Sequence, residues 1–104
     1  MAWIGVDLDG TLAHYEGWNG GAIGEPIPLM VERVKAWLAE GKEVRIVTAR
    51  VNPFPDESSH QRSLIHAWCE KHIGARLVVE CMKDFEMVEL WDDRAIQVIK
   101  NTGE

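Results

Sequence analysis

Two carboxylates near the N-terminus are the side chains best suited to chemistry. Asp7 and Asp9 follow the apolar run 2–6, whose length and β-branched residues predict a buried strand. Because ligands bind α/β sheets at the carboxyl ends of the strands, both side chains are expected at a binding edge. Two acidic groups this close repel each other unless a cation or a proton compensates. With Gly10 and the hydroxyl of Thr11 behind them, they predict a cation-dependent site rather than a simple turn.

The elements that must position these residues alternate between strand and helix patterns. Apolar residues three and four apart predict a helix over 29–40, and the β-branched run 43–48 predicts the next strand. A strand, a helix and a strand within roughly forty residues form a βαβ unit, which implies parallel strands. The remaining elements are expected as a helix ending near residue 73, strands over 76–81 and 88–91, and a final short strand or helix over 95–99. The pattern predicts an α/β domain with a mainly parallel sheet.

Each later strand in this interpretation ends on polar residues. Thr48 ends the second strand, Lys83 follows the third, and Asp92 and Asp93 follow the fourth. Parallel strands present their carboxyl ends at one edge of the sheet, so these side chains are expected near Asp7. The four strand ends together predict a site that holds several carboxylates, one cation and one hydroxyl.

Such a set of side chains fits phosphoryl transfer, which needs charge neutralised on the transferring group and a nucleophile held in line with it. Clustered carboxylates suit Mg²⁺, because this ion prefers oxygen ligands. One Asp can attack phosphorus to give an aspartyl-phosphate, and a second can protonate the leaving oxygen and later activate water. Lys83 would supply fixed positive charge, and Thr48 a hydrogen bond to a phosphoryl oxygen.

The length, net charge and cysteine spacing of the chain exclude several classes of protein. A chain of 104 residues predicts one domain over 1–104. A net charge of −6 without a basic stripe argues against duplex nucleic acid, which leaves a nucleotide or a strand end as the only nucleic acid partner to expect. The two cysteines have no metal or redox spacing, and neither a signal peptide nor an apolar run of about 20 residues is visible. These features predict a cytoplasmic protein that does not cross a membrane.

The stretch 10–26 has no helical or strand periodicity. It holds five glycines together with Tyr15 and Trp18. A connection this long in a small domain usually has a function or some structure of its own. We expect a small hairpin flap that covers the site beside Asp9.

Four motifs resemble those of the haloacid dehalogenase (HAD) superfamily, whose members are mostly Mg²⁺-dependent phosphatases. In order along the chain they are Asp7-Leu8-Asp9-Gly10-Thr11-Leu12, Val47-Thr48-Ala49-Arg50, Lys83, and Trp91-Asp92-Asp93-Arg94. The resemblance implies a three-layer Rossmann-like domain with helices on both faces of the sheet. Since the chain has no room for an inserted cap domain, it resembles the small uncapped branch of the superfamily.

The resemblance also implies a role for each matching residue. Asp7 would be the nucleophile and Asp9 the acid/base, with Thr48 and Lys83 completing the catalytic set. The Mg²⁺ ligands would be Asp7, the main-chain carbonyl of Asp9, Asp92, and Asp93 either directly or through water. Substrate contacts would come from further residues of the first two motifs, namely Gly10, Thr11, Ala49 and Arg50.

The expected activity is therefore that of a Mg²⁺-dependent phosphomonoester hydrolase, a HAD-type phosphatase. An uncapped site suits a bulky phosphorylated substrate, or a homo-oligomer in which a neighbouring subunit closes the site. One alternative is a phosphoryl-accepting signalling module of the receiver type, although its phosphorylated Asp would end the third strand. Another is a phosphate-binding module that kept the fold and lost catalysis, against which the intact set of Asp7, Asp9, Thr48 and Lys83 argues.

Overall fold

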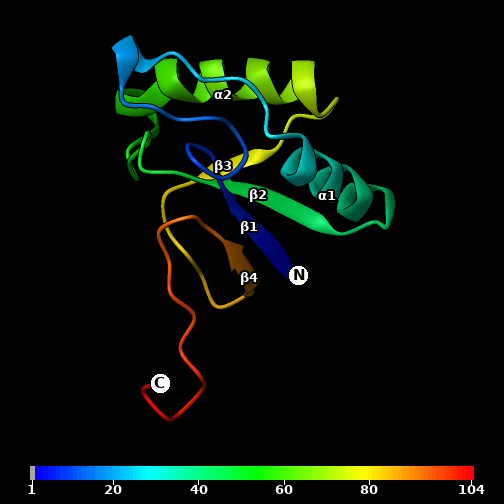
Figure 1. The fold of residues 1–104 in the computed structure, drawn as a ribbon. Helices are drawn as coiled ribbons and strands as arrows, with labels where there is room; N and C mark the ends of the chain where they lie inside the picture. The colour runs from blue at the N-terminus through cyan, green and yellow to red at the C-terminus, as the bar shows by residue number, and fades with distance from the viewer. Residues whose placement is uncertain (1) are drawn as a thin grey trace.

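A four-stranded parallel sheet forms the centre of the protein. The computed structural model describes residues 2–104, without the side chains of residues 55 and 56. The strands are β1 (Trp3–Asp7), β2 (Glu43–Val47), β3 (Val78–Glu80) and β4 (Met87–Trp91). They are hydrogen-bonded in the order β3-β2-β1-β4, and every pairing is parallel (Figure 1). The order brings the end of the first strand beside the ends of β2 and β4.

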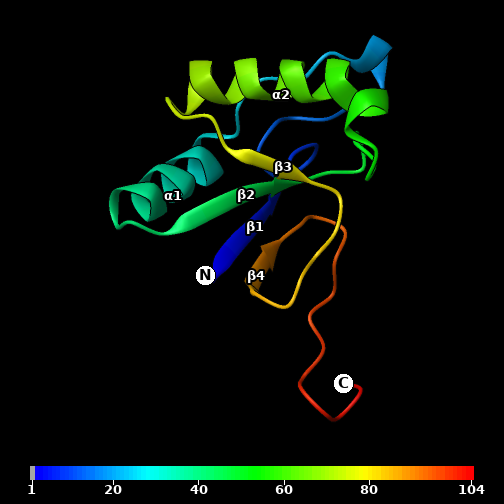
Figure 2. The same ribbon diagram turned by 180° about the vertical axis from the view of Figure 1, so that it is seen from behind.

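Two helices connect the first three strands. Helix α1 (Pro28–Ala39) begins with a proline, whose missing N–H is harmless in the first turn, and Gly41 follows its end with a φ of +81°. Helix α2 (Ser59–His72) follows a short 3₁₀ turn, η2 (Pro55–Ser58). The crossovers β1-α1-β2 and β2-α2-β3 step in the same direction along the sheet, so right-handed connections place both helices on one side of it (Figures 1 and 2).

The hydrophobic core lies between these helices and the sheet. Strand residues of one face, such as Val6 and Ile46, are fully buried, and they belong to one apolar cluster with Val34 of α1 and Ile65 of α2. Because strand side chains alternate between the two faces, Asp7, which follows Val6, points away from this core.

The other face of the sheet is covered by the connection between β3 and β4. The strand order requires this connection, residues 81–86, to pass beneath β2 and β1, and so short a segment has no room for a helix. Trp3 on this face is only 1% exposed, because the Arg45 guanidinium lies 4.5 Å from its ring centre and its Nε1 donates to Asp84 Oδ1 at 2.8 Å. The α/β class and the uncapped three-layer Rossmann-like arrangement are confirmed, with irregular chain rather than a described helix as the third layer.

The flap region 10–26 is tied at its base. Ala13 and Pro26 form an antiparallel bridge, flanked by hydrogen bonds from the His14 N–H to Glu25 O and from the Ile27 N–H to Leu12 O, both 2.8 Å. Beyond this base the chain carries the 3₁₀ turn η1 (Asn19–Gly21) instead of two strands. The expected hairpin is thus limited to its base.

After β4 the chain leaves the sheet. Residues 95–99, expected as a strand or a helix, form neither, and the C-terminus lies well away from the sheet (Figure 1). None of the described helices is long and apolar enough to cross a bilayer.

Candidate functional site

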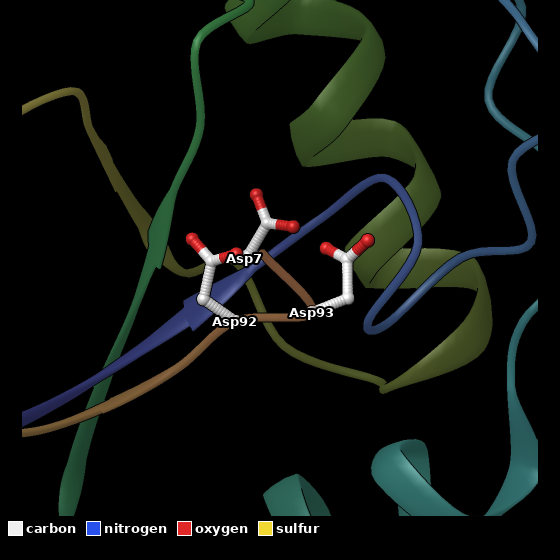
Figure 3. Close-up of side chains that lie close together, drawn as sticks. All are labelled: Asp7, Asp92 and Asp93. Atoms are coloured by element: carbon white, nitrogen blue, oxygen red, sulfur yellow. The ribbon is translucent and has the colours of Figure 1, made fainter. Parts of the chain in front are cut away.

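Three carboxylates meet where β1 and β4 end. Val6 pairs with Trp91 in the parallel register, and one residue further along each strand are Asp7 and Asp92. One carboxylate oxygen each from Asp7, Asp92 and Asp93 lies within 4.8 Å of the others. Figure 3 shows these side chains pointing to the same side of the strand ends. We call these three residues the acidic set.

The turn after β1 supports the acidic set. Thr11 Oγ1 lies 3.3 Å from Asp7 Oδ2 and 3.2 Å from Asp93 Oδ1, and it accepts the Asp93 N–H at 3.0 Å. A hydroxyl has one hydrogen, so it donates to one of the two carboxylates at a time. Gly10 has a φ of +89°, and a Cβ there would lie 2.6 Å from Asp93 Oδ2. Gly10 and Thr11, expected as substrate contacts, therefore lie against the acidic set and shape it.

The acidic set is electrostatically unfavourable without a cation. Burial raises the pKa of Asp7 from 3.8 to about 7, aided by its hydrogen bond with Asp93 and by the charges of Asp92 and Asp93, while the Thr11 hydroxyl acts in the opposite direction. These causes oppose the ionised form of Asp7. A divalent cation bound by all three carboxylates would remove the repulsion.

A cavity of about 570 Å³ opens over these strand ends. Its lining residues are Asp7, Asp9, Tyr15, Trp18, Val47, Thr48, Ala49, Arg50, Asp92, Asp93 and Arg94. Thr48 is buried at the end of β2, and its Oγ1 accepts the Arg50 backbone N–H at 3.2 Å. Among the described contacts no acceptor takes the hydroxyl hydrogen of Thr48, so it can donate into the cavity that this residue lines. The motif after β2 thus reaches the same cavity as the acidic set.

Lys83 lies apart from this cavity. It is exposed in the 81–86 connection, which turns across the other face of the sheet directly after β3, and it is absent from the cavity lining. The two cations that line the cavity are Arg50 and Arg94. Arg94 was not anticipated as a site residue, although its position directly after Asp93 was a signal for it. The positive charge expected from the third strand end therefore does not line this cavity, whose cations follow β2 and β4 instead.

Asp9 does not belong to the acidic set, and its carboxylate binds Arg50 instead. Arg50 Nε donates to Asp9 Oδ2 at 2.7 Å, and Arg50 Nη2 donates to Asp9 Oδ1 at 2.8 Å. The Arg50 side chain is 2% exposed and that of Asp9 18%, so this bidentate pair is largely shielded from water. The two carboxylates of the first motif therefore face different partners. Asp7 lies among acidic groups, and Asp9 is bound to a guanidinium.

Comparisons with known proteins bear on the fold alone. A scan against protein-family models finds no match, and a search of curated proteins finds none either. Among solved structures, the chain is similar to a conserved protein coded by a locus of Bacteroides thetaiotaomicron, with a TM-score of 0.59 and 23% sequence identity. The similarity covers 89% of this chain and 76% of the other. It supports the α/β architecture described above.

Proposed function

We propose that this protein is a Mg²⁺-dependent phosphomonoester hydrolase that forms an aspartyl-phosphate on Asp7. The observation that carries the proposal is the meeting of the acidic set and the Thr48 hydroxyl in one cavity at the carboxyl ends of three parallel strands. The order of the motifs along the chain, which resembles that of HAD phosphatases, supports the same activity.

The residues present fit a magnesium ion. Its ligands would be the carboxylates of Asp7, Asp92 and Asp93 and the main-chain carbonyl of Asp9, all of which are the oxygen ligands that Mg²⁺ prefers. The raised pKa of Asp7 indicates that this arrangement lacks a compensating positive charge. When bound, the ion would neutralise a phosphoryl oxygen and keep the carboxylates ionised.

The protein's own residues would perform the two halves of the reaction. A carboxylate oxygen of Asp7 attacks phosphorus as the bond from phosphorus to the ester oxygen breaks, and Asp9 gives a proton to the leaving oxygen. Asp9 then takes a proton from water, whose oxygen attacks phosphorus and releases phosphate and the Asp7 carboxylate. The Thr48 hydroxyl would donate a hydrogen bond to a phosphoryl oxygen throughout.

A phosphatase screen with and without MgCl₂ tests the proposal. The screen would include p-nitrophenyl phosphate, sugar phosphates, nucleotides, phosphopeptides and 5′-phosphorylated oligonucleotides. We expect Mg²⁺-dependent phosphate release that Asp7→Asn lowers by about 10³-fold or more, because the nucleophile is lost. Absence of turnover on every ester would contradict the proposal. A stable phosphorylated Asp7 without turnover would instead support a phosphoryl-accepting module.

A further inference from the structure

Arg50 uses every hydrogen-bond donor that it has. A guanidinium carries five N–H groups. Two of those in Arg50 bind Asp9, as described above. The remaining three bind Gly21 O at 2.5 Å, Gln61 Oε1 at 3.1 Å and Ala22 O at 3.3 Å. No donor is left for a substrate, so this side chain serves to hold parts of the protein in place.

The partners of Arg50 come from three separate segments of the chain. Asp9 follows β1, Gly21 and Ala22 lie at the tip of the flap, and Gln61 lies in the first turn of α2. Trp18 of the flap adds a further contact, with its ring centre 4.8 Å from the guanidinium carbon. Among the described contacts, the carboxylate of Asp9 meets the flap tip only through Arg50.

We propose that Arg50 is a positioning residue that couples the flap to the orientation of Asp9. Both oxygens of Asp9 are held by one rigid, planar group, and that group is held in turn by two carbonyls of the flap tip. Movement of the flap away from the cavity must therefore break hydrogen bonds to Arg50 or displace the guanidinium from Asp9. Because the coupling is reciprocal, loosening the flap tip loosens the hold of Arg50 on Asp9, and loosening Asp9 loosens the flap tip. The consequence for proton transfer by Asp9 rests on the function proposed above, whereas the mechanical connection does not.

Amide hydrogen exchange of the metal-free protein tests the connection without any assay of activity. The segment to follow is 14–24, where the Gly21 N–H binds Trp18 O and the His14 N–H binds Glu25 O. We expect Arg50→Lys and Asp9→Asn each to speed exchange in this segment by about tenfold, because each removes charge-assisted hydrogen bonds. The double variant should exchange no faster than the faster single variant. The exposed Arg76, which lies outside the flap and the cavity, supplies the charge control Arg76→Gln, for which no change is expected.

The exchange experiment decides the proposal whichever way it turns out. Unchanged exchange in Asp9→Asn would overturn it, because Arg50 would then anchor the flap without coupling it to Asp9. The proposal would also be overturned if the two increases in exchange rate multiply in the double variant, because the two residues would then act independently. Should Arg50→Lys fail to fold, Asp9→Asn alone still gives the answer.

Turnover of two esters tests the consequence for catalysis. A p-nitrophenolate leaving group needs little protonation, whereas the alkoxide of glycerol phosphate needs a well-placed acid. We expect Arg50→Lys to lower kcat/KM for glycerol phosphate at least about tenfold more than for p-nitrophenyl phosphate. Equal losses on both esters would contradict positioning of Asp9 by Arg50. Lack of turnover by the wild-type protein would count against the proposed function, while the exchange result on the connection would stand.

Discussion

Asp7 and Asp9 are two residues apart, yet their surroundings differ in charge. Asp7 shares its space with Asp92 and Asp93, and its pKa is raised to about 7. Asp9 is bound on both oxygens by Arg50. The surroundings of Asp7 suit a cation-binding side chain, whereas Asp9 must release at least one of its hydrogen bonds from Arg50 before one of its oxygens can carry a proton.

Substitutions at Asp9 and Asp92 should separate metal binding from turnover. We expect Asp9→Asn to lower turnover by about 10²-fold or more and to leave Mg²⁺ affinity nearly unchanged, since only its main chain would bind the ion. Asp92→Asn should weaken Mg²⁺ binding by about tenfold or more, because it removes a charged oxygen ligand. Titration calorimetry of both variants would measure this. Equal loss of affinity in the two would contradict the division of roles.

Gly10 should tolerate substitution poorly. Gly10→Ala places a Cβ 2.6 Å from Asp93 Oδ2 at a φ of +89°, whereas Gly41→Ala has a similar φ of +81° and nothing within 4 Å. We expect Gly41→Ala to lower the free energy of unfolding by about 1 kcal/mol from backbone strain, and Gly10→Ala by about 1 kcal/mol more. Urea denaturation of both variants would measure the difference. Equal losses would show that the contact with Asp93 costs nothing.

At the scale of elements, β4 is held in place by an aromatic contact with α1. The ring centres of Trp91 and Trp37 are 5.3 Å apart, and the Arg33 guanidinium lies 5.1 Å from the centre of the Trp91 ring. Trp91 immediately precedes Asp92. The packing of α1 against this strand end therefore fixes the place of two of the three members of the acidic set.

Trp91→Leu should weaken both the fold and the proposed Mg²⁺ site. We expect the free energy of unfolding to fall by about 1–2 kcal/mol, because the aromatic contact is lost, and Mg²⁺ binding to weaken several-fold, because the strand end is less well held. Leu90→Ala is the matched control, since its side chain points to the other face of the same strand and is 40% exposed. Denaturation and calorimetry would measure both quantities. Equal weakening of Mg²⁺ binding by the two variants would exclude a specific role of Trp91.

For the whole molecule, the acidic set should make stability depend on pH and on Mg²⁺. The pKa of Asp7 is about 7 in the folded state and 3.8 in the reference state, so the folded protein binds this proton more tightly than the unfolded chain. The contribution of Asp7 to stability is complete below pH about 4 and is lost as the pH rises through about 7. Mg²⁺ should reverse this loss, because binding at the proposed site would favour the folded state.

Thermal denaturation between pH 5 and 8 would test this expectation. Without metal, we expect the wild-type protein to be on the order of 1 kcal/mol less stable than Asp7→Asn at pH 8, a value reduced for the partial exposure of the group. The difference should be clearly smaller at pH 5, and MgCl₂ should stabilise the wild-type protein more than the variant at pH 8. Parallel pH profiles of the two proteins, with equal responses to MgCl₂, would contradict the account of the acidic set.

Much of the fold could be predicted from the sequence, because helices and strands follow local periodicity. The β-branched runs that end at Asp7, Thr48 and Asp92 became parallel strands, and their ends meet at one edge of the sheet. Two features could not be foreseen: the flap has no paired strands beyond Ala13 and Pro26, and residues 95–99 form no strand or helix. Strand pairing depends on a partner strand that the local sequence does not specify.

The sequence by itself determined which side chains gather at the strand ends, since a strand and its direction place the next residues at a known edge. Only the tertiary structure decided which of these side chains meet. It separated Lys83 from the cavity, because the route of residues 81–86 depends on the order of all four strands. It also bound Asp9 to Arg50, because that contact needs the flap, β1 and α2 folded together. Such contacts join segments that are far apart in the chain, so no local sequence pattern predicts them.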